Sequence, residues 1–195
     1  MKFIFCILFV LRCASAQFSA TAKEAILKTH NDLRSAIARG NYSANEVLRL
    51  PASNMRKMKW DSCLEESARN LAITCPDDHY EGAEYGENVF VIYTGTPGLI
   101  RYWALEHWIS QLNSQWYERT ITKDTQMAWA EIDSIGCYLQ KCEQWSSEPP
   151  LDKIVMVCKY ELPDNLSSSR LYKPGTACSS CDPGFTCETD SGLCV

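Results

Sequence analysis

The segments QMAWAEI (residues 126–132), IGCYLQ (135–140) and IVMVCKY (154–160) decide the fold class of this chain. Each is short and rich in β-branched and aromatic residues, and turn-like or polar residues separate it from the next, so three strands are expected. They follow three expected helices, and strands and helices do not alternate. This order predicts an antiparallel sheet packed against helices, which is an α+β domain.

Helical periodicity marks the residues that precede those strands. Gly40 is positioned to end the first helix, and Asp61 suits the N-cap of the second, which Pro76 ends. The third follows Thr96-Pro97, which suits an N-cap and a first helical residue, and neither proline nor glycine interrupts it. The expected helices cover about residues 22–39, 62–75 and 99–117.

The first 16 residues have the pattern of a secretory signal peptide. Lys2 precedes an apolar run at residues 3–11, and Ala14-Ser15-Ala16 offers the small residues that a signal peptidase recognises. The run is shorter than the roughly 20 apolar residues that span a bilayer, and no later stretch approaches that length. We therefore expect a soluble, secreted, extracellular protein without a transmembrane segment.

The charge balance of the chain is acidic, with 19 basic and 24 acidic residues among 195. Removal of residues 1–16 takes away Lys2 and Arg12 and no acid, so the formal net charge of −5 becomes −7. An acidic protein of this kind is a poor partner for nucleic acid or for an anionic membrane. We expect neither as a ligand.

Eleven cysteines are present, and Cys6 and Cys13 lie in the signal peptide, which leaves nine. The odd number predicts an unpaired thiol or a bond to another chain, hence a monomer or a weak dimer. Apolar residues near the C-terminus are too few for a core, so two local disulfides are expected there. We place the main domain at residues 17–170 and a cysteine-rich tail at 171–195. The tail cysteines are Cys178, Cys181, Cys187 and Cys194.

Two sequons, at Asn41 and Asn165, fall in an expected loop and in the connection to the tail, so both are glycosylation candidates. The chain has three histidines and lacks the zinc-protease, serine-hydrolase, Walker and dinucleotide motifs. His30 and His107 lie on expected helices, where backbone hydrogen bonding or packing is the simpler explanation. His79 lies in a glycine-containing loop and is the more interesting of the three.

Five segments form a pattern that is informative only in combination: HNDLR (30–34), GENV (86–89), TQMAWA (125–130) with IGC (135–137), VCKY (157–160) and the tail 175–195. In this pattern the chain resembles the CAP superfamily, which groups cysteine-rich secretory proteins, antigen five and class-one plant pathogenesis-related proteins. It is most similar to the activation-associated secreted proteins of parasitic nematodes, in the branch of the hookworm platelet inhibitor and neutrophil inhibitory factor. The resemblance implies a three-layer α-β-α sandwich with a small disulfide-stapled tail.

The resemblance also implies a central cavity with two histidines and two glutamates, a set suited to zinc or a similar divalent ion. His79 and Glu87 match two of those positions, whereas Gln111 replaces a glutamate and Lys123 replaces a histidine. These changes shift the cavity by about two charge units against a cation, and protonated lysine is a poor ligand. We therefore expect no metal and no other cofactor, and we hypothesise that Lys123 pairs with Glu87.

A pairing of Cys142 with Cys158 across adjacent strands is a further implication of the resemblance. Two of the three cysteines Cys63, Cys75 and Cys137 then share one bridge. Related nematode chains often carry another cysteine near the mature N-terminus, and its absence between residues 17 and 22 explains the odd count.

We expect no catalytic residue and no enzyme activity, because no nucleophile stands at a recognisable spacing and half of the cavity set has changed. The resemblance implies a secreted parasite effector that binds a host cell-surface receptor, an integrin among the candidates. Such an effector would modulate haemostasis or immunity by antagonising platelet or leukocyte adhesion. The alternative is an extracellular carrier of lipid or sterol, as some members of the superfamily are.

Overall fold

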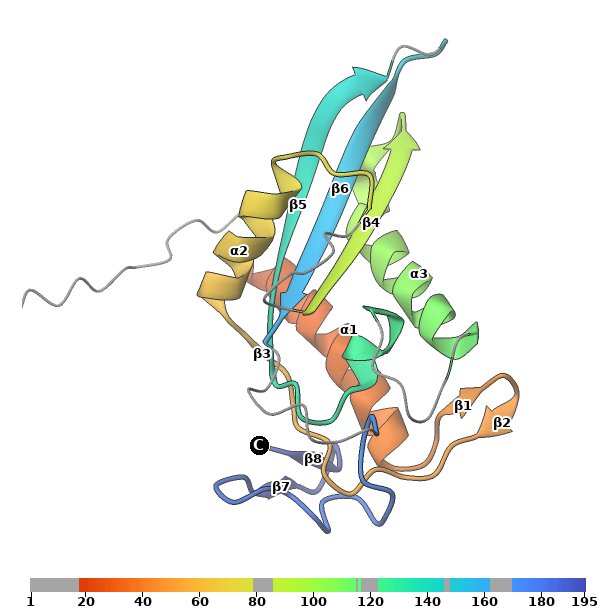
Figure 1. Ribbon diagram of the computed structural model, residues 1–195, viewed down its shortest axis with the longest axis vertical. Coiled ribbons are helices and arrows are strands. Elements are labelled where there is room, and N and C mark those ends of the chain that lie inside the picture. The colour runs from red at the N-terminus through yellow and green to blue at the C-terminus, as the bar shows by residue number, and fades with distance from the viewer. Residues whose placement is uncertain (1–17, 79–85, 115, 117–122, 146–147, 162–169) are drawn as a thin grey trace, which may run out of the picture.

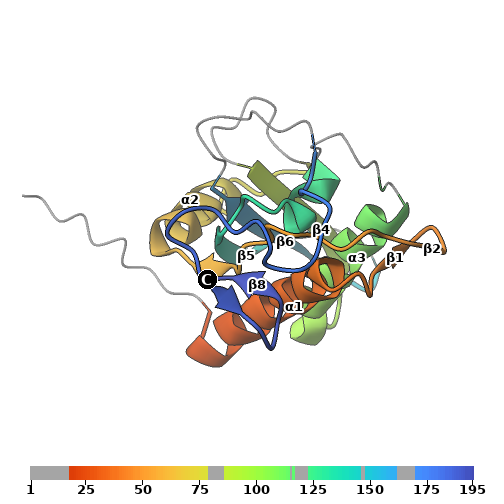
Figure 2. The same cartoon turned by 90° about the horizontal axis from the view of Figure 1, so that it is seen from below.

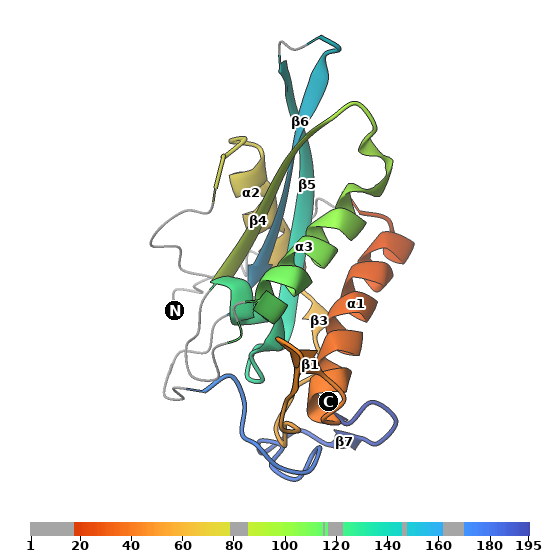
Figure 3. The ribbon, with the colours of Figure 1, turned by 90° about the vertical axis from the view of Figure 1, so that its right-hand side faces the viewer.

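A three-layer α-β-α sandwich is formed by the residues that the computed structural model describes, namely 18–78, 86–114, 116, 123–145, 148–161 and 170–195. A central sheet separates α2 from α1 and α3 (Figures 1 and 3). This confirms the predicted fold class, whereas the signal peptide and Asn165 lie outside the described residues. The elements are α1 (Ala20–Ala38), β1 (Ser43–Ala44), β2 (Val47–Leu48), β3 (Lys59–Trp60), α2 (Ser62–Ala72), β4 (Gly86–Thr94), η1 (Pro97–Leu99), α3 (Ile100–Ser114), η2 (Lys123–Ala128), β5 (Ser134–Trp145), β6 (Leu151–Tyr160), β7 (Cys187–Glu188) and β8 (Leu193–Cys194).

The central sheet has four strands in the order β3-β5-β6-β4. β6 is antiparallel to both of its neighbours, whereas the short β3 pairs in parallel with β5 at one edge. The strands predicted at residues 135–140 and 154–160 are confirmed within β5 and β6. The sequence interpretation misses β4, which lies between α2 and α3 in the chain, so helices and strands are less segregated than predicted.

The strand predicted at residues 126–132 is wrong. Lys123–Ala128 forms the 3₁₀ helix η2, and a turn follows it. The cause is Arg34 of α1, whose fully buried guanidinium donates hydrogen bonds of 2.7–3.1 Å to four backbone carbonyls of this segment. Carbonyls gathered around one group cannot alternate in direction as those of a strand do, so the tertiary contact overrides the local pattern. The acceptors are Met127, Trp129, Ala130 and Ile132.

The three predicted helices are confirmed with small shifts of their ends, and Asp61 caps α2 as expected. Figure 3 shows α2 on one face of the sheet and α1 and α3 on the other. The larger apolar core lies on the side of α1 and α3, and a smaller cluster lies under α2. α2 approaches β5 most closely at Gly136, where a Cβ atom would stand 2.0 Å from the backbone nitrogen of Glu65. A residue with a side chain therefore does not fit at Gly136 unless the helix moves.

Two disulfides cross-link the main domain, and they correct the expected pairing. Cys137 is bonded to Cys158 and Cys75 to Cys142, so the predicted bond between Cys142 and Cys158 is wrong. The expectation that two of Cys63, Cys75 and Cys137 share one bridge is wrong as well. The strand register explains the outcome, because Cys137 and Cys158 are opposite residues of β5 and β6. Cys142 lies further along β5 and is bonded to Cys75, which lies just past the end of α2. Cys63 is exposed on α2, outside these bonds.

The cysteine-rich tail contains the two local disulfides that were expected, and it packs against α1 (Figure 2). The Cys194 amide donates to the Met55 carbonyl at 2.8 Å, and the Lys57 amide donates to the Cys194 carbonyl at 2.9 Å. Leu193 is completely buried in the main core. The tail thus contributes to the core, and the domain boundary at residue 170 stays a prediction. The tail bonds are Cys178–Cys187 and Cys181–Cys194.

Within the described part of the chain, every helix is too short or too polar to cross a membrane.

Candidate functional site

Glu87, the acid of the expected cavity set, lies near the start of β4 and is buried. Its carboxylate accepts a hydrogen bond from the ammonium group of Lys159, the residue directly opposite on β6. The exposed fractions of the two residues, 5% and 6%, make this a buried ion pair. Such a pair is costly to break from one side, because the remaining charge stays in a medium that solvates it poorly.

The other members of the set are placed less completely. Gln111 lies half-buried on α3, and Lys123 is the first residue of η2. The side chain of Lys123 and the whole of His79 lie outside the described part, so the pairing of Lys123 with Glu87 stays a hypothesis. The cation seen beside Glu87 is Lys159. η2 does reach β4, since the Gln126 side-chain amide donates to the backbone carbonyl of Glu87 at 3.1 Å.

His30 is buried on α1 and has the structural role that was predicted. Its Nδ1 lies 2.9 Å from the carbonyl oxygen of Ile26, one turn earlier, and its Nε2 lies 3.0 Å from the hydroxyl of Tyr160. Burial lowers the pKa of His30 to about 4, so the ring is neutral at pH 7. His107 is exposed on α3 and packs against Phe90, with the ring centroids 5.4 Å apart.

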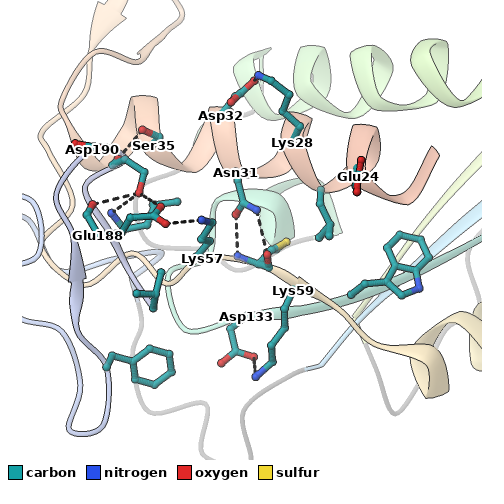
Figure 4. A pocket seen from close by; sticks show the side chains of 17 residues that line it. Glu24, Lys28, Asn31, Asp32, Ser35, Lys57, Lys59, Asp133, Glu188 and Asp190 are labelled. Atoms are coloured by element: carbon teal, nitrogen blue, oxygen red, sulfur yellow. Dashed lines mark hydrogen bonds and ion pairs between the residues drawn. The ribbon is translucent and has the colours of Figure 1, made fainter. Parts of the chain in front are cut away.

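A groove of about 800 Å³ lies away from these residues, along the exposed side of α1 (Figure 4). Residues 57–60 form the opposite wall, and the tail closes one end. Asn31 of α1 reaches across to Met58, where its side chain donates to the carbonyl at 3.0 Å and accepts from the amide at 2.8 Å. This double contact fixes the separation of the two walls.

Residues 27–160 match the sequence profile of the CAP family, described as the cysteine-rich secretory protein family. That range is more than half of the 195 residues. The chain belongs to the CAP family.

Named relatives extend this assignment. Mouse (Mus musculus) peptidase inhibitor 16 is 30% identical over 185 residues, which cover 88% of this chain and 33% of the mouse protein. Chicken (Gallus gallus) peptidase inhibitor 15 is 30% identical over 200 residues, which cover 87% of this chain and 69% of the chicken protein. This CAP chain thus spans about a third of the length of the first relative.

Solved structures of similar shape include two CAP proteins. NaASP2 with Zn²⁺ has a TM-score of 0.77 and 26% identity, and the match covers 94% of this chain and 100% of NaASP2. The hookworm platelet inhibitor has a TM-score of 0.71 and 27% identity, and the match covers 93% of each chain. Both similarities support the CAP sandwich.

The described donors of this CAP chain do not fit a zinc ion. Lys159 is paired with one carboxylate oxygen of Glu87, so a cation bound to that carboxylate would lie close to the ammonium group and be repelled by it. Gln111 offers a neutral amide in place of a second carboxylate. Among the described residues, no group of three His, Cys, Asp or Glu side chains could hold a metal. We therefore route no step of the proposed function through a metal.

Lys159 is the residue of this region that sequence reasoning missed. It is the one charged residue in the run IVMVCKY, and a lysine in a buried strand requires a carboxylate close by. Recognition of β4 as the neighbour of β6 would have identified Glu87 as that partner. The groove has no comparable signal, because one end of it is closed only when the tail folds back onto α1.

Proposed function

We propose that this CAP protein is a secreted, non-enzymatic effector that binds a host receptor and antagonises integrin-dependent adhesion of platelets or leukocytes. The similarity to the hookworm platelet inhibitor over 93% of both chains supports this. That protein is named as an inhibitor of platelets and the mouse relative as an inhibitor of peptidases, and neither name states a reaction that the protein catalyses.

The pairing of Glu87 with Lys159 is the observation that carries the non-enzymatic part of the proposal. A general base or a metal ligand needs a carboxylate that substrate or metal can reach, and this one is buried and held by an ammonium group. His30 is likewise engaged at both ring nitrogens. Function then depends on the surface of the scaffold.

Secretion is supported by the disulfides and by Asn41. Four disulfides are present among the described residues, and such bonds persist in oxidising compartments. Asn41 is exposed in the loop between α1 and β1, where a glycan can be attached without disturbing the core.

An adhesion assay tests the proposal directly. Platelets or neutrophils are allowed to attach to immobilised fibrinogen in the presence of purified protein, with excess zinc in one arm and a zinc-selective chelator in another. We expect dose-dependent inhibition that neither arm changes. Protein that has been reduced and alkylated serves as the control and should be inactive, because the tail and the sheet lose their cross-links.

Two results would contradict the proposal. One is undisturbed adhesion at protein concentrations that saturate any surface binding. The other is inhibition that grows with incubation time, leaves a cleaved receptor and disappears in Glu87→Gln, since that pattern belongs to an enzyme.

A lipid carrier is the second candidate, and the partly exposed apolar side chains that line the groove, Leu27, Trp60 and Phe185, favour it. Organic extraction of the purified protein followed by mass spectrometry separates the two functions. Stoichiometric lipid in the extract would support the carrier, and we expect none.

A further inference from the structure

The groove beside α1 has a volume of about 800 Å³, which is in the range of ligand sites in proteins. Its shape is held from both ends. Asn31 joins the walls, and at the tail end the Ser35 hydroxyl donates to the Ser191 carbonyl at 2.5 Å. The ammonium group of Lys57 lies 2.6 Å from a carboxylate oxygen of Glu188, which ties the second wall to the tail. The groove is therefore preformed.

The groove is lined by five carboxylate side chains and three ammonium groups. Each ammonium group already has an acidic partner: Lys28 with Asp32, Lys57 with Glu188 and Lys59 with Asp133. Two of the five carboxylate side chains therefore have no lysine partner in the groove.

Those two carboxylates are Glu24 and Asp190, which are exposed. Neither carboxylate has an ion pair or hydrogen bond to another described residue, and Figure 4 shows no contact drawn from Glu24. The charged side chains that line the groove thus carry a net negative charge, beside apolar lining residues such as Leu27, Trp60 and Phe185. Anionic ligands, such as nucleic acid or a phosphate group, are repelled from such a surface.

Backbone groups of Trp60 add a polar feature. The amides of Lys59 and Asp61 donate to carbonyls on the β5 side, of Asp133 and Ile135, at 2.8 Å each. Successive residues of a strand alternate in direction, so the amide and carbonyl of Trp60 face away from β5, at the open edge of the sheet. No hydrogen bond joins these two groups to another described residue. A ligand with its own peptide groups can pair with them.

We propose that this groove is the docking site for a basic, partly apolar peptide segment of a partner protein. Lysine or arginine side chains of the segment lie against Glu24 and Asp190, and its apolar side chains cover the partly exposed Leu27, Trp60 and Phe185. The assignment rests on the proposed function, since it names the surface by which the protein engages its receptor.

Fluorescence anisotropy tests the proposal with a short fluorescein-labelled peptide of alternating lysine and leucine. A peptide of alternating glutamate and leucine and a labelled fatty acid serve as comparison probes. The test variant is Glu24→Gln with Asp190→Asn, which removes charge and keeps shape. The matched control is Glu106→Gln with Glu161→Gln, two exposed acids that do not line the groove.

We expect the basic peptide to bind the wild-type protein and the control variant equally, and to bind the test variant about tenfold more weakly at low ionic strength. The acidic peptide should not bind. In NMR spectra, the indole N–H signal of Trp60 should shift on binding, whereas that of the fully buried Trp129 should stay in place. Equal peptide affinity in both variants overturns the assignment, as does binding of the fatty acid in preference to the basic peptide.

The adhesion assay separates this inference from the function on which it rests. If the test variant no longer inhibits adhesion while the wild-type protein and the control variant do, the result supports both the groove assignment and the proposed function. If that variant inhibits adhesion as well as the wild-type protein does, the receptor docks elsewhere and the groove assignment fails while the proposed function stands. If the peptide binds through Glu24 and Asp190 but the wild-type protein leaves adhesion unchanged, the groove stands and the proposed function fails.

Discussion

The Nε2 atom of His30 lies 3.0 Å from the hydroxyl of Tyr160, and this contact joins α1 to the last residue of β6 inside the core. Both side chains are fully buried. Burial lowers the pKa of His30 to about 4 and raises the pKa of Tyr160, so the neutral form of each is favoured. The nearby Arg34 cation further disfavours a second positive charge on the imidazole.

Stability should therefore fall in acid because of His30. Above pH 6.5 the ring is neutral in both states, and the folded protein has its full stability. Between pH 6.5 and about 4, His30 is protonated in the unfolded chain and still neutral in the folded protein. This difference lowers the free energy of unfolding by about 3 kcal/mol in total. Urea unfolding at pH 7 and pH 4.5 measures the loss.

His30→Gln should remove this part of the pH dependence, at some cost in stability at pH 7, whereas His107→Gln on the surface should not change it. An NMR titration that gives His30 a pKa near 6.5 in the folded protein would contradict the prediction.

Arg34→Met should destabilise the protein by about 4 kcal/mol. The side chain makes five hydrogen bonds to backbone carbonyls, and methionine fills its volume but supplies no donor. The carbonyls of Trp129 and Ala130 keep an amide donor, of Ile132 and Arg56, whereas the other three lose the donor described for them. Arg101→Met, at an exposed position of α3, is the control and should change the free energy of unfolding by less than about 0.5 kcal/mol. Comparable denaturation midpoints for the two variants would show that the carbonyls find other partners.

Gly136→Ala should cost about 3 kcal/mol or prevent folding, because the added methyl group collides with the backbone of α2. Gly98→Ala is the matched control, since nothing lies within 4 Å of a Cβ atom there. Thermal unfolding of both variants checks the comparison. If the Gly136 variant melts with the control, α2 does not approach β5 as closely as described.

Peptide mapping without reduction should recover Cys75 linked to Cys142 and Cys137 linked to Cys158. Replacement of the first pair by serine removes a cross-link between residues 67 apart and should cost about 4 kcal/mol. The same change at Cys178 and Cys187, which are 9 apart, should cost about 2.5 kcal/mol. A fragment that links Cys142 to Cys158 would refute the strand register.

Lys159→Met should destabilise the protein by about 3 kcal/mol, because the buried carboxylate of Glu87 loses its ammonium partner. The double variant with Glu87→Gln should recover much of that loss. Lys141→Met on β5 is the control and should cost less than about 1 kcal/mol, since its side chain is 61% exposed.

Titration calorimetry of the wild-type protein with zinc belongs to the same prediction. We expect no stoichiometric binding at sub-micromolar affinity. Tight binding that His79→Ala abolishes would show that Lys159 does not keep zinc from the site.

The long elements of the fold can be predicted from the sequence because their signals are local. The apolar stripe of Ile26, Leu33 and Ile37 and the cap at Asp61 place α1 and α2 without any knowledge of their neighbours. The prediction of a strand at residues 126–132 is wrong for the opposite reason, because the decisive contact is not local. Its alternation suggests a strand, but a side chain about 95 residues away in the sequence determines where its carbonyls point.

In the candidate site, too, some features have a local sequence signal and others depend on contacts between distant segments. Glu87 could be located by its motif, whereas its pairing with Lys159 depends on the register of β4 with β6, which no single segment encodes. The disulfide correction has the same origin, since Cys137 and Cys142 look equivalent until the register is known. The groove depends on packing between segments more than 100 residues apart, so only the folded chain reveals it.

The contact between Ser35 and Ser191 spans 156 residues of sequence, and contacts of such long range raise the contact order of the fold. α1 is among the first segments to leave the ribosome, yet the surface on which it packs is complete only when residues near 190 have followed. Folding of such a chain is expected to be slow. It is also coupled to oxidation, because the Cys181–Cys194 disulfide cross-links the tail that packs against α1. Before the tail disulfides form, the tail end of the groove is not held closed, so an oxidising environment is needed to complete the surface on which binding depends.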